Sequence, residues 1–396
     1  TWTIARSNPT NKDQENKIVT NQTNLTTKFN TGAVKHSFST GLELTREEQS
    51  NNNFFAAGAI PGVVALPAAN LYSPNSNVTA FNRVQNGTGN KGTTDTVGLY
   101  AFDTITLNQN WLINAGIRYD HYSTDYDATT RTGTGPITAT SLSTSGDLWS
   151  GQLGLIYKPT ENGSIYASYG TSAQPPGGNN FSLAASGNSA NRTDFDPQET
   201  TTAEIGTKWD LLDKKLAVAA ALYRTDVENE VIQDPTNTAL YTQGGKKRVQ
   251  GVELTAAGAI TDRWGVSAGF TTMDTKIVSG PAVTADGSSV IAYTPKHAFS
   301  AWTTYQLPFN VTVGGGARYV GTLHRGTDGA IGTPTYVESY WVFDAMASWR
   351  VNKNFELQFN VYNLFDKEYV AAINKSGYRY IPGTPRSGRV TANFFF

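Results

Sequence analysis

The chain has 396 residues, no cysteine and a formal net charge of −1 at pH 7, and only 16% of its residues are charged. The missing cysteines exclude a disulfide scaffold, a cysteine-ligated metal site and thiol catalysis, and the near-zero charge gives no reason to expect nucleic acid as a partner. Soluble domains carry about 25% charged residues, yet the mean hydropathy of −0.37 is that of a polar chain. This combination is typical of a sheet with one apolar face and one wetted face.

Membrane-spanning helices are excluded by the hydropathy pattern. No stretch approaches the roughly 18 consecutive apolar residues that such a helix needs, and the most apolar run lies around Leu216–Leu222. The first residues, Thr1 to Ile4, lack the basic start and apolar core of a signal peptide. If the protein is secreted, we expect that its leader has been removed. A β-barrel remains compatible with these observations.

In chain order, the sequence predicts fifteen strands in which apolar and polar residues alternate with period 2. In Trp111–Tyr119, for example, the odd-numbered residues are apolar and the even-numbered residues from Asn114 on are polar or glycine. The predicted spans are 17–30, 33–47, 94–107, 110–123, 147–158, 163–173, 199–211, 214–230, 241–259, 263–277, 293–307, 310–325, 335–351, 353–366 and 384–396. A truncated strand at Thr1–Ser7 brings the expected number to about 16, an even number as in bacterial barrels.

Two kinds of connection alternate between these strands. Short turns are predicted at 31–32, 108–110, 160–163, 212–214, 261–263, 308–310 and 352–354. Long polar segments lie between them, at about 49–92, 124–146, 172–197 and 277–292. Outer-membrane barrels have short periplasmic turns and long outer loops, whereas a soluble sandwich has no reason to sort its connections. The sequence therefore predicts an all-β, antiparallel transmembrane barrel in the outer membrane of a Gram-negative bacterium.

Aromatic residues support this interpretation at the strand ends and at the C-terminus. Tryptophans lie near the predicted short turns, as in the aromatic girdles that mark both membrane interfaces. The last strand places Phe394 and Phe396 on one face, and the chain ends on Phe396. This ending resembles the signal read by the barrel assembly machinery, which we expect as a partner together with outer-membrane lipids and lipopolysaccharide.

Several motifs resemble those of TonB-dependent outer-membrane receptors, most closely the group for catecholate-type siderophores. The stretch Phe359–Tyr369 looks like their penultimate-strand motif, and Ile381–Arg386 precedes the last strand as it does in siderophore receptors. Further matches run along nearly the whole chain: His36–Glu43, Glu199–Lys208, Gln250–Glu253, Thr294–His297, Ala317–Gly321 and Tyr340–Asp344.

The resemblance implies an importer of ferric siderophores that uses energy supplied through TonB. Members of the family carry a leader, a segment that contacts TonB, a globular plug and a barrel of about 22 strands. We therefore expect residues 1–396 to be the C-terminal portion of such a barrel, with the plug and the TonB contact in a missing N-terminal region. A plugless barrel is the alternative.

A ferric tris-catecholate is anionic and flat-faced, so cations and aromatic rings near the outer strand ends are the expected contacts. The candidates are Arg318, His324, Arg325, Lys246, Lys247, Arg248, Tyr378, Arg379 and Tyr380. Each also has a structural interpretation: a lumen arginine can pair with an acidic neighbour, the 246–248 cations can bind lipopolysaccharide phosphates or water, and the tyrosines can pack within their loop.

Other chemistries have little support in the sequence. The four histidines are scattered over different strands without metal-ligand spacing, and no Ser-His-Asp arrangement can be argued. We therefore expect no enzyme, no metal site and no cofactor, the ferric siderophore being the transported ligand. A passive porin, an adhesin or autotransporter, and a receptor for haem, cobalamin or another ligand remain alternatives.

Overall fold

The computed structural model describes residues 2–6, 13–56, 59–63, 66–78, 83–176, 182–185, 189, 191–234, 237, 240–326, 332–374 and 379–396. All regular elements in these ranges are strands. Within the same ranges, no helix has the length and apolarity needed to cross a membrane.

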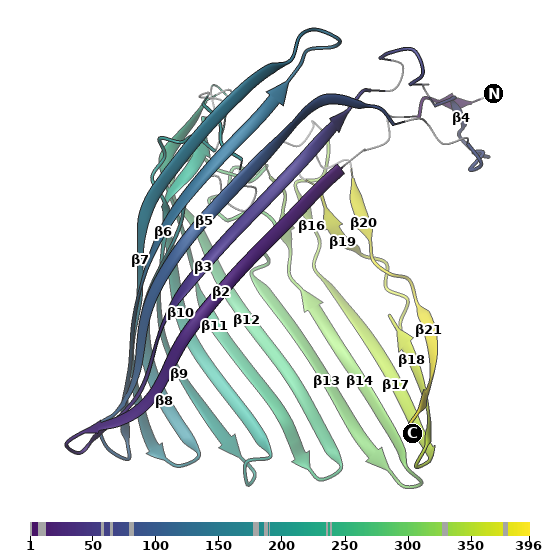
Figure 1. The fold of residues 1–396 in the computed structure, drawn as a ribbon. Coiled ribbons are helices and arrows are strands. Elements are labelled where there is room, and N and C mark those ends of the chain that lie inside the picture. The colour runs from purple at the N-terminus through teal and green to yellow at the C-terminus, as the bar shows by residue number, and fades with distance from the viewer. Residues whose placement is uncertain are drawn as a thin grey trace.

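One antiparallel sheet of 15 strands forms the wall of the molecule, and it curls around a central space (Figure 1). Its strands follow the order of the chain, so that each pairs with the next one along the sequence. They are β2 (Asp13–Thr31), β3 (Val34–Phe54), β5 (Gln85–Thr106), β6 (Trp111–Thr130), β7 (Thr138–Thr160), β8 (Gly163–Gln174), β9 (Gln198–Leu211), β10 (Leu216–Gln233), β11 (Tyr241–Thr261), β12 (Trp264–Ser279), β13 (His297–Leu307), β14 (Val311–Val320), β17 (Tyr340–Asn352), β18 (Phe355–Tyr362) and β21 (Ser387–Phe394). The fifteen alternating segments predicted from the sequence are confirmed, as is the antiparallel all-β fold.

The predicted sixteenth strand, Thr1–Ser7, is not part of this wall. Its described residues form only β1 (Thr3–Ile4), which pairs with β4 (Ala69–Asn70) in a separate two-stranded sheet. Seven residues are fewer than the roughly nine to eleven of a transmembrane strand, and Thr3 and Ile4 pair with β4 instead. Two further small sheets lie among the outer loops: β15 (Leu323–His324) with β16 (Tyr336–Val337), and β19 (Val370–Ile373) with β20 (Tyr380–Pro382).

Several wall strands continue well beyond their predicted outer ends. β3, β5, β6 and β7 have 21, 22, 20 and 23 residues, so parts of the predicted loops 49–92 and 124–146 are paired strand. Alternating hydrophobicity stops at the membrane boundary, but backbone pairing of threonine- and serine-rich hairpins does not need an apolar face. Conversely, the strand predicted at 310–325 ends at Val320, and the one predicted at 335–351 begins at Tyr340.

The two faces of the wall differ in chemistry. The row that alternates along Trp111–Tyr119 is apolar and faces lipid, while the opposite row carries Arg118, which pairs with Asp120 and Glu43. Cross-strand pairing of Leu99 with Tyr119 places Leu99 on the lipid face and Tyr100 on the inner face. The pairing thereby assigns the faces of β5, the strand whose alternation is least regular.

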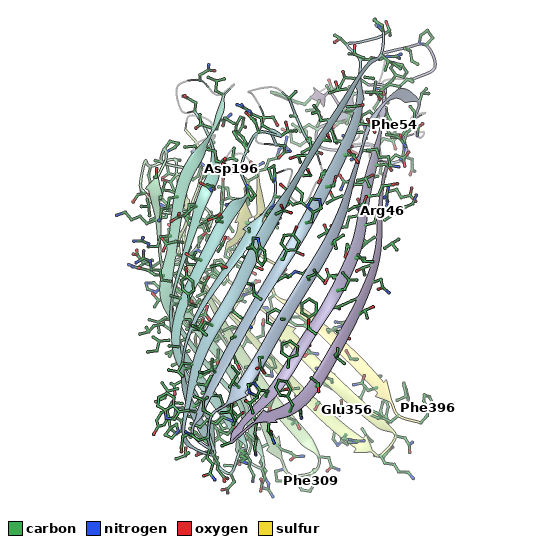
Figure 2. The ribbon with its side chains drawn as sticks, turned by 60° about the vertical axis from the view of Figure 1, so that its left-hand side comes forward. Arg46, Phe54, Asp196, Phe309, Glu356 and Phe396 are labelled. Carbon is green, nitrogen blue, oxygen red and sulfur yellow. The ribbon has the colours of Figure 1, made fainter. Side chains whose placement is uncertain are left out.

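Aromatic rings mark two levels of the lipid face. Near the short turns Trp111 packs on Tyr157, with ring centroids 4.7 Å apart, and eight residues further along each strand Tyr119 packs on Trp149 at 5.0 Å. Eight residues span roughly 26 Å along a strand, comparable with the apolar band of about 25 Å in outer-membrane barrels. Figure 2 shows the two ends: the short turn at Phe309 lies at one, and Phe54 and Asp196 lie at the other.

Candidate ligand-binding site

The candidate site lies at the outer ends of β14 and β17, where alternation turns successive side chains to opposite faces. Trp341 lies in the lipid-facing aromatic row and packs on Tyr319 at 5.0 Å. Tyr340, one residue earlier, therefore faces inward, and it is only 8% exposed. Tyr340 pairs with Val320, and Arg318 is two residues from Val320 on β14, so that Arg318 shares this inner face.

Tyr369, in the connection after β18, joins these two side chains. Its ring lies on that of Tyr340 with centroids 4.2 Å apart, and its hydroxyl accepts a hydrogen bond from Nη2 of Arg318 at 3.3 Å. The backbone N–H of Gly383 donates to the carbonyl of Tyr369 at 2.7 Å. A Cβ at Gly383 would come closer than 3.0 Å to the Tyr369 ring, so glycine permits this approach. The result is a fixed pair of tyrosines beside an exposed guanidinium.

A cavity of about 1200 Å³ opens against this pair. Two more tyrosines line it, Tyr336 on β16 and Tyr380 on β20. Its charged lining residues are Glu338, Asp366, Lys367 and Glu368. Asp366 is occupied, because its carboxylate accepts the backbone N–H of Arg386 at 2.8 Å and lies 3.9 Å from the Arg386 guanidinium.

This arrangement suits a flat aromatic ligand that carries negative charge. Ring faces of tyrosine bind planar groups by offset stacking, and a guanidinium donates charge-assisted hydrogen bonds to anionic oxygens. The exposed carboxylates Glu338 and Glu368 oppose such a ligand. Affinity for an anion must therefore come from the tyrosines and Arg318, with Lys367 as the additional cation.

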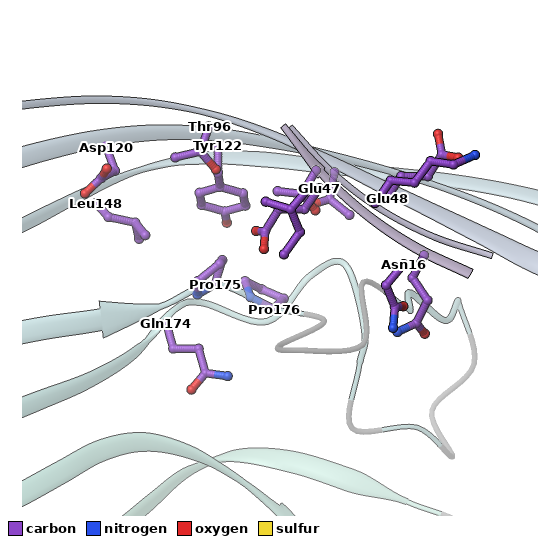
Figure 3. A pocket seen from close by; sticks show the side chains of 15 residues that line it. Asn16, Glu47, Glu48, Thr96, Asp120, Tyr122, Leu148, Gln174, Pro175 and Pro176 are labelled. Carbon is purple, nitrogen blue, oxygen red and sulfur yellow. The ribbon is translucent and has the colours of Figure 1, made fainter. Parts of the chain in front are cut away.

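A second, smaller cavity of about 510 Å³ lies at the outer end of the long strands on the opposite side of the wall. Pro175 and Pro176, which follow β8, lie across from Asp120 and Tyr122 there (Figure 3). Glu47 also lines this cavity. Its lining includes three carboxylates and one lysine, as the other cavity does, but Tyr122 is its one lining tyrosine among the described residues, against four in the other cavity. We therefore assign an aromatic ligand to the tyrosine-lined cavity.

The structure brings together only some of the residues predicted for ligand contact. Tyr380 lines the tyrosine-lined cavity, and Arg318 lies beside it through its hydrogen bond to Tyr369. His324 instead contacts Asp286 at 2.8 Å within the outer loops. Arg325 is 4% exposed, and its guanidinium donates to the backbone carbonyls of Pro334 and Gly326. Arg379 is exposed, with its carbonyl bound to the N–H of Asn374 at 2.8 Å. Tyr378 lies outside the described residues.

The predicted cations at the outer end of β11 are all paired with acids of β10. Lys246 pairs with Glu228, Lys247 with Glu230, and Arg248 with Asp226 at 2.8 Å. They also do not form one surface, because neighbouring residues of a strand point to opposite faces. The structure thus places this triplet away from the tyrosine-lined cavity.

Tyr336, Tyr340 and Tyr369 were not among the predicted contacts. Tyr340 was detectable in principle, since it lies on the opposite face from the lipid-facing Trp341. No sequence pattern indicates that Tyr336 and Tyr369, in separate outer loops, meet Tyr340 around one cavity.

A curled antiparallel wall with an apolar outer face and two aromatic levels is the architecture of a transmembrane β-barrel. The family model described as "TonB dependent receptor-like, beta-barrel" matches residues 2–364. The chain belongs to this family, which confirms the resemblance found in the sequence.

Its relatives include siderophore receptors. The chain is 50% identical to the catecholate siderophore receptor Fiu of Escherichia coli strain K12 over 412 residues, which cover 100% of this chain and 53% of that protein. It is 33% identical to the probable TonB-dependent siderophore receptor PiuA of Acinetobacter baumannii, over 96% of this chain and 53% of PiuA. The chain thus spans about half the length of the curated relatives it matches.

Solved structures show the same fold. The closed-form crystal structure of the ferric-catecholate import receptor Fiu from E. coli K12 matches with a TM-score of 0.90 at 49% identity, covering 97% of this chain and 55% of that one. The siderophore receptor PiuA from A. baumannii matches with a TM-score of 0.79 at 31% identity, over 97% of this chain and 56% of PiuA. The relatives are thus transport receptors, and none of these names denotes an enzyme.

Proposed function

We propose that this chain forms the wall and outer loops of a receptor that imports ferric siderophores of the catecholate type across the outer membrane of a Gram-negative bacterium. The observation that carries the proposal is the cluster of Tyr340, Tyr369 and Arg318 beside the 1200 Å³ cavity. The names of the relatives, Fiu above all, support the same ligand class.

The chemistry of the ligand explains why this cluster would select it. In a ferric catecholate the metal's ligands are oxygens on aromatic rings, and the complex carries net negative charge. Stacking on Tyr336, Tyr340 and Tyr380 would hold the rings, while Arg318 would donate hydrogen bonds to the oxygens. In this proposal the ferric complex is cargo rather than a resident cofactor.

Import against a gradient requires energy, which the proposal assigns to TonB acting on a part of the whole protein outside these residues. The chain itself would contribute binding and passage rather than catalysis. Its outer face would contact membrane lipids, and Phe394 at the end of β21 together with Phe396 would present the signal for the barrel assembly machinery.

Equilibrium binding to the whole receptor in detergent tests this function. Tryptophan fluorescence would be titrated with a ferric tris-catecholate, a ferric hydroxamate, haem and cobalamin. We expect the catecholate to bind at least about tenfold more tightly than the others, which corresponds to roughly 1.4 kcal/mol. Binding of haem or cobalamin alone would instead favour a receptor for that ligand, and binding of none of the four would favour a passive porin.

A further inference from the structure

The lipid-side face of the wall carries a cluster of charged residues at the outer ends of β10, β11 and β12. The register assigns them to this face, since directly paired residues of neighbouring strands share a face. Starting from the lipid-facing Ile117, the ladder of paired residues runs through Gly151, Thr171, Thr201, Asp226, Arg248 and Lys276. Asp226, Arg248 and Lys276 therefore point outward, away from the ligand cavity.

The cluster begins where the apolar surface ends. Leu222 pairs with Val252 on the lipid face, and Leu222 is 56% exposed. Arg224 lies only two residues beyond Leu222, on the same face and toward the outer loops. Charged side chains directly above a lipid-facing apolar row lie at the level of lipid headgroups.

Two guanidiniums in the cluster share one carboxylate. Nε of Arg224 donates to Oδ2 of Asp226 at 2.7 Å, and Nε of Arg248 donates to Oδ1 at 2.8 Å. The Asp226 side chain is 12% exposed, against 50% for Arg224 and 27% for Arg248. Each arginine is held through Nε, and its two terminal nitrogens make no other hydrogen bond within the described part of the chain. Asp226 thus fixes the two guanidinium groups and leaves their terminal nitrogens available to a ligand on the lipid-side face.

A third cation, Lys276, lies beside these two arginines. Lys276 is paired directly with Arg248 across the strands, an arrangement of like charges that is unfavourable without an anion between them. Within the described ranges Lys276 has no ion-pair partner, and the carboxylate of Asp274 accepts Gln250 at 3.4 Å. Around Asp226, three cations face the two carboxylates of Asp226 and Asp274, while further out on the same face Lys246 pairs with Glu228, which lies opposite Glu199.

We propose that Arg224, Arg248 and Lys276 bind a phosphate group of an outer-leaflet glycolipid, with Asp226 as the positioning residue. Paired guanidiniums bind phosphate oxygens by parallel charge-assisted hydrogen bonds, and the phosphate supplies the missing negative charge between Arg248 and Lys276. The acyl chains of the same lipid lie along the apolar row of Leu222 and Val252. This site is independent of the proposed transport function.

Lipid binding to the whole receptor in detergent tests the site, by native mass spectrometry with bisphosphorylated lipid A and with lipid A from which both phosphates have been removed. We expect Arg248→Gln and Lys276→Gln to weaken binding of the bisphosphorylated lipid about tenfold. The matched control is Lys247→Gln, one residue along the same strand on the inner face, which should bind as the unmodified receptor does.

Lys276→Gln breaks no ion pair within the described residues, so it keeps the test decisive if Arg248→Gln fails to fold. Folding is checked by the mobility of unheated protein in gels. Equal binding of the dephosphorylated lipid, or unchanged binding by Lys276→Gln, overturns the proposal. Competition by inorganic phosphate as strong as by the lipid would equally overturn it, because the cluster would then hold an adventitious ion only.

Discussion

Arg318 and Tyr369 are 51 residues apart in the chain and meet inside the mouth of the barrel, where Nη2 of the arginine donates to the tyrosine hydroxyl at 3.3 Å. Strand β14 supplies the cation and the connection after β18 supplies the ring. The contact joins the wall to an outer loop at the cavity that we assign to the ligand. Changes in either side chain should therefore alter ligand binding.

Replacing Arg318 by glutamine should weaken binding of a ferric tris-catecholate about tenfold or more, because a charge-assisted hydrogen bond contributes roughly 1.5–3 kcal/mol. Tyr369→Phe, which removes only the hydroxyl, should cost less. Arg350→Gln is the control: this arginine lies at the short-turn end of β17, over the ring of Phe395. Titration of the purified receptor gives the affinities, and an equal loss for Arg318→Gln and Arg350→Gln would contradict the assignment.

Removing a carboxylate from the same cavity should increase the affinity for the ferric complex rather than reduce it. Glu368 lines the cavity and is exposed, so its charge repels an anionic ligand. Glu368→Gln should raise the affinity for the ferric complex by a few fold, roughly 0.5–1 kcal/mol, and the gain should shrink as salt is added. The same titration at low and high ionic strength measures it. A lower affinity in Glu368→Gln would mean that the carboxylate contacts the ligand.

Glycines on the inner face should differ sharply in their tolerance of a methyl group. A Cβ at Gly316 would come closer than 3.0 Å to the ring of Trp302, whereas a Cβ at Gly269 would meet no atom within 4 Å. Gly316→Ala should lower the free energy of unfolding by about 1–3 kcal/mol, while Gly269→Ala should be neutral or slightly stabilising. Urea denaturation of receptor refolded into micelles compares them, and equal midpoints would argue against the packing of Trp302 on Gly316.

Asp286, which contacts His324 at 2.8 Å, is one of the contacts that attach the loop between β12 and β13 to the next outer loop. Backbone hydrogen bonds from Ala285 to Arg325 and from Tyr293 to His324 are others. Hydrogen bonds from the backbone N–H and hydroxyl of Ser288 hold the pKa of Asp286 well below its usual range. A lowered folded-state pKa means that the contribution of this carboxylate to stability is complete above its unfolded pKa, about 3.9. The contribution is lost as the pH falls further below that value.

We therefore expect the loop to stay attached from neutral pH down to about pH 5 and to loosen below about pH 4. Asp286→Asn should loosen it at every pH, with about tenfold faster hydrogen exchange at the amides of Ala285 and Ser288. Asp194→Asn, in a different outer loop, is the control. Loss of protection already between about pH 7 and pH 5 would show that another group controls the attachment.

The C-terminal aromatic residues should matter more for assembly than for stability. Phe394 packs on Phe355 at 5.0 Å, whereas Phe396 is fully exposed. Deleting Phe396 should lower the amount of folded receptor in the outer membrane several-fold while leaving the urea midpoint of refolded protein within about 0.5 kcal/mol. Normal membrane levels in the deletion strain would show that Phe396 is not part of the assembly signal.

The strands of the wall were predictable from the sequence because the alternation that defines each strand lies within a short stretch of the chain. Lipid on one face and water on the other impose a period of 2, which Trp111–Tyr119 displays. The outer parts of β3 and β5 were not predicted, because strands that extend beyond the membrane have no lipid-facing side and so show no alternation of apolar and polar residues. Thr1–Ser7 was wrongly assigned to the wall because a short alternating stretch does not show which strand it pairs with.

The candidate site was only partly predictable, for a different reason. Arg318 could be identified as a cation on the inner face near an outer strand end. The meeting of Tyr340 with Tyr369 depends on how separate loops fold over the mouth, which no periodicity encodes. Lys246–Arg248 looked like one basic patch in the sequence, but strand geometry and the acids of β10 divide it into separate ion pairs.

The most direct test of the central claim is uptake of radiolabelled iron by cells that carry the whole receptor and no other catecholate receptor. We expect saturable uptake of the ferric tris-catecholate that disappears in cells without TonB and falls strongly in the Arg318→Gln variant. Uptake that continues without TonB would indicate a passive pore. Uptake of iron only from a hydroxamate or from haem would contradict the assignment of the tyrosine-lined cavity to catecholates.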